Sequence, residues 1–273
     1  MSTGSDKLYR RYLSALGWVG DPGLHELVRS HLIKVPFENV SKLLRCAESD
    51  EPKPFTMEDF VAGIETRDLG GGCYAINRYF SQLLRFLEYD VSLLAAKIGN
   101  QERAHVVLLV NFEDGKYLVD VGFGAPFHDL INLSELPYKV NHGDFTYELR
   151  RHPLFKSQYE MIKTVSGRKS VTYAFNETLP LGPEAFDEAA AESLRPQGPL
   201  LDRLHIARFF DSRAYELHNN KLLTTSHNVT TTQALGSVRE VEDFVRERML
   251  LDRCPVGEAI DVLAKRGIDI FAS

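Results

Sequence analysis

The sequence predicts an α+β fold made of three consecutive parts, residues 1–89, 90–185 and 186–273. Apolar residues recur with helical spacing in the first part. The second part consists of short runs rich in β-branched and aromatic residues, separated by Gly, Asn, Asp or Pro. The third part has an Ala/Glu/Pro-rich stretch followed by two strand-like runs and then by helical segments. We therefore expect a helical unit, a β unit and a mixed α/β unit, in that order.

The N-terminal part contains signals for several short helices. Residues 6–17 and 22–34 show helical spacing, and Pro36 follows the end of the second segment. Thr56 with Asp59 three residues later is typical of a helix N-terminus.

A further helix is expected directly after Cys73. Its apolar residues fall at spacings of three and four and form one buried stripe, with Cys73 on that stripe in the first turn. These residues are Ile76, Phe80, Leu83, Leu84 and Leu87.

The β unit is predicted from six runs: DVSLLAAKIG, AHVVLLVNF, GKYLVDVGF, FTYELRR, QYEMIKTV and SVTYAFNE. In the third part, LHIARFF and AYELHNNKLLTT are strand-like, and VREVEDFVRERML and VGEAIDVLAKRG are helical.

Composition and charge exclude several classes of protein. The 273 residues are 44% hydrophobic, enough for a core, and 32 Lys and Arg stand against 38 Asp and Glu. This acidic balance argues against a nucleic-acid partner. No signal peptide or apolar run of membrane-spanning length is present, so we expect a cytoplasmic protein without a membrane partner.

The three cysteines give neither a disulfide framework nor a metal site. Cys46, Cys73 and Cys254 are odd in number, far apart and outside any Cys/His ligand cluster. We expect no metal, and a cysteine with a function should act through its thiolate.

Three glycines precede Cys73 in the stretch GGGCYAIN, residues 70–77. A cysteine at a helix N-terminus lies at the positive end of the helix dipole, which favours the thiolate. Glycines allow close approach to the sulfur, and their N–H groups could stabilise an oxyanion. The alternative is an inert buried cysteine, since most lone cysteines on an apolar stripe are structural.

A nucleophilic cysteine needs a base and a group that orients the base. His105 in AHVVLLV and Asp120 in YLVDVGFG are polar residues in otherwise apolar strands. Each could instead be structural, as a core histidine or a turn-capping aspartate. His205, in a later strand, is the second candidate for the base.

The expected hairpin between these two strands leaves their distance open. A two-residue turn at residues 114–115 would place Asp120 opposite Leu109, four residues from His105. That offset is about 13 Å at the rise of a strand. Either the hairpin is longer and bulged, or the strands coil so that the two side chains converge.

Four segments together resemble the arylamine N-acetyltransferase family. They are Pro36-Phe37-Glu38-Asn39, the Gly-Gly-x-Cys motif at Gly70–Cys73 with Asn77 four residues on, His105, and Asp120-Val121-Gly122-Phe123-Gly124.

The resemblance implies a Cys-His-Asp triad used for acyl transfer, with Cys73 as nucleophile, His105 as base and Asp120 holding the imidazole. Acetyl-CoA, as acyl donor and co-substrate, would acylate Cys73. An arylamine, hydrazine or hydroxylamine would then accept the acyl group in a ping-pong cycle, as in xenobiotic metabolism.

The resemblance also implies a pocket and an architecture. Phe37, Tyr74 and Phe123 would line the acceptor pocket, and Gly122 and Gly124 would leave room near the thioester. The family architecture is an N-terminal helical bundle, a central β-barrel and a C-terminal α/β lid.

This chain departs from the family pattern beside the nucleophile. Leu69 and Ala75 stand where the family has Arg and Glu. An Arg/Glu network near Cys73 is therefore absent or rebuilt around Arg67, Asp68 or Arg78.

Three other functions remain open from the sequence. One is an amide synthase of the same fold that takes an acyl chain from a carrier protein and closes a macrolactam. Another is a cysteine hydrolase or transglutaminase-like enzyme with the same triad. The last is an inactive relative that serves as a binding or structural module.

Overall fold

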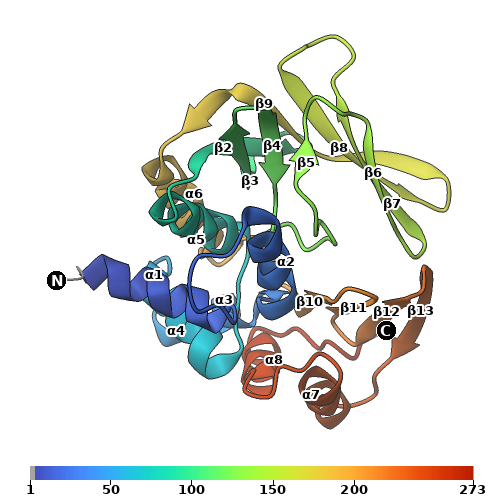
Figure 1. The fold of residues 1–273 in the computed structure, drawn as a ribbon. Helices are drawn as coiled ribbons and strands as arrows, with labels where there is room; N and C mark the ends of the chain where they lie inside the picture. The colour runs from blue at the N-terminus through green and yellow to red at the C-terminus, as the bar shows by residue number, and fades with distance from the viewer. Residues whose placement is uncertain (1–3, 273) are drawn as a thin grey trace.

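A computed structural model describes residues 4–272 of the chain. Helices from the first third lie beside a curved, barrel-like sheet, and a second sheet with two helices completes the molecule (Figure 1). This arrangement confirms the predicted α+β fold class.

The helices of the first third begin and end close to the predicted positions. At α4 both bonds of the predicted capping box are present, between Thr56 and Asp59. A helix that the sequence reading missed, α3, lies between α2 and α4. The helices of this region are α1 (Gly4–Ala15), α2 (Leu24–Lys34), α3 (Val40–Glu48), α4 (Met57–Arg67) and α5 (Cys73–Phe86).

The barrel-like sheet has eight antiparallel strands in the order β5-β4-β3-β2-β9-β8-β7-β6. Two of its strands, β5 and β6, fall outside the six predicted runs. The strands are β2 (Asp90–Ile98), β3 (Gln101–Phe112), β4 (Gly115–Val119), β5 (Ile131–Asn132), β6 (Tyr138–His142), β7 (Phe145–Arg151), β8 (Gln158–Val165) and β9 (Arg168–Leu181).

The second sheet combines the two ends of the chain, in the order β1-β10-β11-β12-β13. The run AYELHNNKLLTT, read as one strand-like segment, is a hairpin of two strands, β11 and β12. The elements are β1 (Phe37–Glu38), β10 (His205–Phe209), β11 (Arg213–His218), β12 (Lys221–Ser226), β13 (Val229–Ala234), the 3₁₀ helix η1 (Pro183–Phe186), and helices α6 (Asp187–Ser193), α7 (Val238–Glu247) and α8 (Val256–Lys265).

Both faces of strand β3 carry buried residues, because each face packs against a different part of the core. Val106 and Leu108 pack with α5 and the other N-terminal helices. Val107 and Leu109 point into the barrel with the aromatic residues of β7, β8 and β9. Burial on both faces explains the near-continuous apolar run of this strand. His105 lies on the same face as Val107 and Leu109, the face toward the barrel.

The N-terminal third also contributes to the core beneath the second sheet. Val40 and Leu43 of α3 are buried there with residues of β10, β11, α7 and α8. The described residues before 90 and after 185 therefore share a sheet and a core, and the division into three separate domains stays a prediction.

Two searches of the described residues 4–272 bear on membranes and metals. No helix there is long and apolar enough to cross a bilayer. Nor do His, Cys, Asp and Glu side chains in that range form a group of three that could hold a metal ion.

Candidate active site

The three glycines before Cys73 have different structural roles. A Cβ on Gly70 would lie 2.0 Å from the carbonyl oxygen of Pro36, so this position needs close backbone approach. Gly71 has φ +135°, in the region that favours glycine. Gly72 is the N-cap of α5 in ordinary extended conformation, and a Cβ there would meet no atom within 4 Å.

The cysteine that follows them is the first residue of α5 and is half-buried. The N-cap Gly72 makes no side-chain hydrogen bond to the helix. The N–H of Ala75 bonds back to the carbonyl of Gly72 at 3.0 Å, so the start of the helix presents the N–H groups of Cys73 and Tyr74 without a capping side chain.

Glu38 holds the glycine loop in place. Its buried carboxylate accepts N–H bonds from Gly70 at 3.1 Å and from Ser41 at 2.8 Å. Its own N–H donates to the carbonyl of Gly71 at 3.1 Å. Burial raises the pKa of Glu38, and these N–H bonds oppose the shift. The sequence reading matched Glu38 to a motif but assigned it no role.

The hairpin between β3 and β4 corrects the predicted register. Phe112 pairs with Gly115, so the turn consists of residues 113–114, one residue earlier than expected. Continued beyond Val119, this ladder would place Asp120 two residues from His105 instead of four. Because β4 ends at Val119, Asp120 also lies outside the ladder, where its side chain can turn toward the histidine.

His105 and Asp120 form a buried pair. The Nε2 atom of His105 lies 2.8 Å from Oδ2 of Asp120, and the side chains are 3% and 0% exposed. Burial lowers the pKa of His105, but the charge and hydrogen bond of Asp120 and the contact with the Cys73 thiol raise it to about 10. Since Nε2 is bound to Asp120, Nδ1 is the ring nitrogen left for the thiol.

Asn77 of α5 orients Asp120 from the other side. Its Nδ2 donates to Oδ1 of Asp120 at 2.8 Å and to the carbonyl of Val106 at 2.6 Å, and its Oδ1 accepts from the N–H of Val121. Asn77, one helical turn after Cys73, thus links α5 to the strand that carries His105 and to the loop that carries Asp120. The sequence assigned Asn77 to a motif without giving it a structural role.

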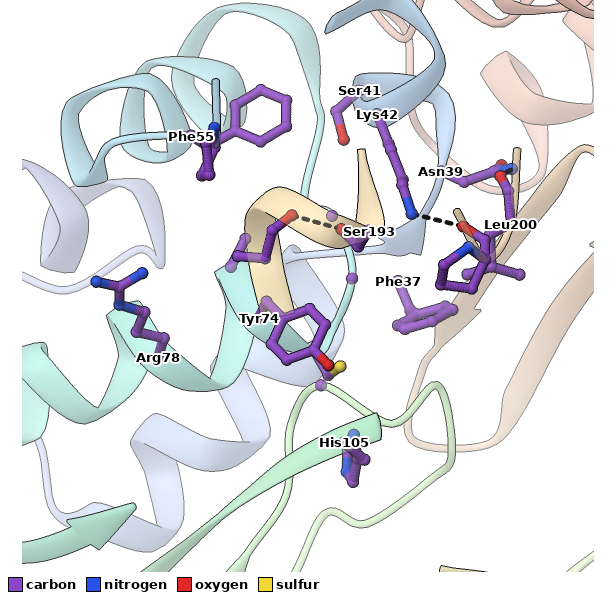
Figure 2. Close-up of a pocket in the computed structure, with 18 of the residues that line it drawn as sticks. Phe37, Asn39, Ser41, Lys42, Phe55, Tyr74, Arg78, His105, Ser193 and Leu200 are labelled. Carbon is purple, nitrogen blue, oxygen red and sulfur yellow. Dashed lines mark hydrogen bonds between the residues drawn. The ribbon is translucent and has the colours of Figure 1, made fainter. Parts of the chain in front are cut away.

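A cavity of about 290 Å³ opens beside Cys73 and His105 (Figure 2). Phe37, Tyr74, Phe123 and Gly122 line it, as the resemblance implied. Gly124 does not appear on its wall. It has φ +74°, and a Cβ there would lie 3.1 Å from the ring of Phe37, so Gly124 makes room for that ring.

The cavity wall includes residues that the sequence reading missed. Ser193, Leu194, Pro199 and Leu200 come from the Ala/Glu/Pro-rich stretch around α6, where no chemical motif marks them. Lys42 of α3 also lines the cavity. Its signal in the sequence is a single cation in the stretch VSKLL, residues 40–44, directly after the Pro-Phe-Glu-Asn segment.

His205, the second candidate for the base, lies away from the nucleophile. Its ring contacts Phe37 at 5.3 Å and His218 at 4.2 Å between centroids, and it is not on the cavity wall. Burial, followed by the neighbouring His218, lowers the pKa of His205 to about 3. The geometry therefore favours His105.

The three residues considered for a rebuilt ionic network each pair with the C-terminal part of the chain. Arg78 binds Asp187 at 2.6 Å, Asp68 binds Arg253 at 2.5 Å, and Arg67 binds Glu258 at 3.4 Å. These ion pairs join α4, its C-terminal cap and α5 to α6, to the loop before α8 and to α8 itself.

Comparison with known proteins identifies the family. A sequence model of the N-acetyltransferase family matches residues 22–253. The arylamine N-acetyltransferase of Mycolicibacterium smegmatis is 27% identical over 259 residues, which are 88% of this chain and 90% of that protein. Proansamycin X synthase of Amycolatopsis mediterranei is 33% identical over 130 residues, or 42% of this chain and 48% of that protein.

Solved structures agree in fold. The crystal structure of a Mycobacterium smegmatis arylamine N-acetyltransferase variant has a TM-score of 0.76 at 25% identity, covering 96% of this chain and 98% of that one. The Mycobacterium marinum enzyme in complex with CoA has a TM-score of 0.76 at 22% identity, covering 94% and 98% of the two chains. With the family model spanning most of its length, this chain belongs to the arylamine N-acetyltransferase family of enzymes.

Proposed function

We propose that this enzyme moves an acetyl or other short acyl group from coenzyme A to an arylamine, hydrazine or hydroxylamine through a thioester on Cys73. The observation that carries the proposal is the buried His105–Asp120 pair, placed so that the free ring nitrogen of His105 meets the thiol at the start of α5. This is the arrangement that a nucleophilic cysteine requires.

In the first half-reaction the Cys73 thiolate attacks the carbonyl carbon of acetyl-CoA. The C–S bond to coenzyme A breaks as the new thioester forms, and His105 supplies the proton that the leaving thiolate takes up. In this proposal the N–H groups of Cys73 and Tyr74 at the start of α5 stabilise the oxyanion that develops during the attack.

In the second half-reaction the amine nitrogen attacks the Cys73 thioester and His105 accepts its proton. The thiolate of Cys73 leaves and is ready for the next cycle. An aromatic amine is weakly basic, so it needs an activated acyl group, and a thioester supplies one.

The lining of the cavity supports a flat acceptor. Rings of Phe37, Tyr74 and Phe123 surround the space next to Cys73, and apolar planar surfaces suit an aromatic ring. The complex of the Mycobacterium marinum enzyme with CoA supports coenzyme A as the donor carrier.

Mass spectrometry of the intact protein tests the proposal directly. Incubation with acetyl-CoA alone should add one acetyl group and release one coenzyme A, and 4-methoxyaniline should then restore the original mass. Cys73→Ala should abolish the acetylation, whereas the matched variants Cys46→Ala and Cys254→Ala should retain it. Acetylation that persists in Cys73→Ala would rule out the proposed thioester.

A second candidate is the amide synthase that takes its acyl chain from a carrier protein. The match to Proansamycin X synthase favours this reading, although it spans less than half of either chain. An enzyme of this kind would be silent toward every short acyl-CoA while its Cys73 is acylated by an acyl carrier protein. A cysteine hydrolase would instead turn over the thioester without any amine.

A further inference from the structure

One cation on the wall of the active-site cavity has no carboxylate partner among the described residues 4–272. Three side chains that carry formal charge line the cavity besides His105: Glu38, Lys42 and Arg78. The two oxygens of Glu38 accept backbone N–H bonds, and Arg78 binds Asp187 at 2.6 Å. Of these three, only Lys42 pairs with neither a carboxylate nor two backbone groups within residues 4–272.

The contacts of Lys42 leave donors unused. Its Nζ donates to the carbonyl of Pro199 at 2.5 Å, and within residues 4–272 no carboxylate lies at ion-pair distance from it. An ammonium group has three N–H donors, so a single carbonyl does not satisfy it. Figure 2 shows the side chain extending from α3 toward Leu200, on the same side of the cavity as Phe37.

The surroundings make this charge costly. The rest of the wall is mainly apolar, with the rings of Phe55, Tyr74 and Phe123. Burial lowers the pKa of Lys42 to about 8, and the negative charge that Cys46 and Cys73 carry as thiolates opposes the shift. A bound anion would offset the cost by pairing with the ammonium.

We propose that Lys42 binds a carboxylate carried by one of the two substrates inside the cavity. The carboxylate would belong either to the acceptor, as in an aminobenzoate, or to an acyl group derived from a dicarboxylic acid, as in malonyl-CoA. This inference rests on the proposed acyl transfer and deepens it. The phosphates of coenzyme A fit less well, because the long pantetheine arm places them far from the thioester.

Binding measurements test the proposal without catalysis. In a Cys73→Ala background, Kd values are compared for benzoate against benzamide and for malonyl-CoA against acetyl-CoA. In one of the pairs we expect the member with the additional carboxylate to bind more tightly, and Lys42→Met to reduce that preference about tenfold or more. The pair that responds identifies the substrate that carries the carboxylate. Lys265→Met, an exposed lysine on α8, is the matched control.

Kinetics give the second readout in the otherwise unmodified enzyme. The ratio of kcat/KM for 4-aminobenzoate to that for 4-aminobenzamide, or for malonyl-CoA to acetyl-CoA, should fall about tenfold in Lys42→Met. Lys42→Gln provides a smaller change if the first variant does not fold, and Lys42→Arg should keep part of the preference.

Two results would overturn the inference. One is the absence of any Lys42-dependent charge preference in both binding pairs. The other is an equal loss of affinity for acetyl-CoA and malonyl-CoA in Lys42→Met, which would assign Lys42 to coenzyme A itself. A failure of the proposed acyl transfer is distinguishable, because it would leave the binding comparison in Cys73→Ala intact.

Discussion

Nε2 of His105 and Oδ2 of Asp120 lie 2.8 Å apart with both side chains excluded from solvent. This one contact sets the tautomer of the imidazole, because a carboxylate at Nε2 requires a proton there. It therefore leaves Nδ1 for Cys73, the nucleophile of the proposed reaction.

Replacing that carboxylate should remove most of the activity. In Asp120→Asn the amide no longer stabilises the imidazolium or enforces the tautomer, and kcat should fall by about three to four orders of magnitude. Steady-state acyl transfer measures the effect. Asp129→Asn is the matched control, because Asp129 also bonds a histidine, His25 at 3.2 Å, but on the surface. A fall in kcat below tenfold in Asp120→Asn would contradict the assigned role.

The same pair should make stability depend on pH in a defined direction. The pKa of His105 is raised to about 10 in the folded protein, above its ordinary 6.5. The stabilisation is therefore complete below pH 6.5 and is lost as the pH rises through about 10. The Tm difference between the natural protein and His105→Gln should shrink from pH 7.5 to pH 10.

A second buried histidine provides the control for that measurement. Burial lowers the pKa of His31 to about 3, so it is neutral in folded and unfolded chains above pH 7.5. The Tm difference for His31→Gln should stay constant over this window. A parallel decline in both variants would show that the effect does not come from the His105–Asp120 pair.

The sequence predicted the elements that carry Cys73 and His105 better than it predicted the geometry between the candidate site residues. Apolar spacing and turn residues placed Cys73 at a helix start and His105 on the barrel face of its strand, since both signals are local. The turn was predicted one residue late because Asp114-Gly115 is a strong two-residue turn signal, whereas Gly115 itself pairs with Phe112. Each such shift moves a strand pairing by two residues.

The cavity wall could be predicted only in part. Phe37 and Tyr74 lie within recognisable motifs, but Ser193 and Leu200 are placed by the docking of a distant segment. Asn39 fixes that segment: its Nδ2 donates to the carbonyls of Leu200 and Arg203, and its Oδ1 accepts from His205. These hydrogen bonds join residues that are more than 160 positions apart in the chain, so no local pattern in a single sequence indicates them.

Asn77 should prove to be a positioning residue. In Asn77→Ala, Asp120, the carbonyl of Val106 and the N–H of Val121 lose buried partners, which should cost on the order of 3 kcal/mol of stability. We expect kcat to fall about 10- to 100-fold, with a smaller change in the KM for acetyl-CoA.

The control for Asn77 is an amide that bonds an aspartate on the surface. Asn111 donates to Asp90 at 3.0 Å at the exposed end of β3. Asn111→Ala should leave kcat within about twofold of the natural enzyme and change stability by about 0.5 kcal/mol or less. Loss of stability in Asn77→Ala with unchanged kcat would show that this side chain serves the fold alone.

The three glycines before Cys73 should respond unequally to alanine. Gly70→Ala places a Cβ against the Pro36 carbonyl oxygen, so the loop must move, with a cost of about 1–3 kcal/mol and a displaced nucleophile. Gly71→Ala should cost a similar ~1–3 kcal/mol, because φ +135° is strained for alanine. Gly72→Ala meets no atom within 4 Å and should fold normally.

Denaturant unfolding and the rate of Cys73 acetylation together separate these cases. Gly70→Ala and Gly71→Ala should lose stability and acetylation rate together, since both distort the loop that Glu38 holds. Gly72→Ala keeps the backbone, so any slower acetylation in that variant would come from its methyl group narrowing the approach of the acyl donor to the sulfur. Equal losses of stability in all three variants would contradict the separate roles that the backbone assigns to these glycines.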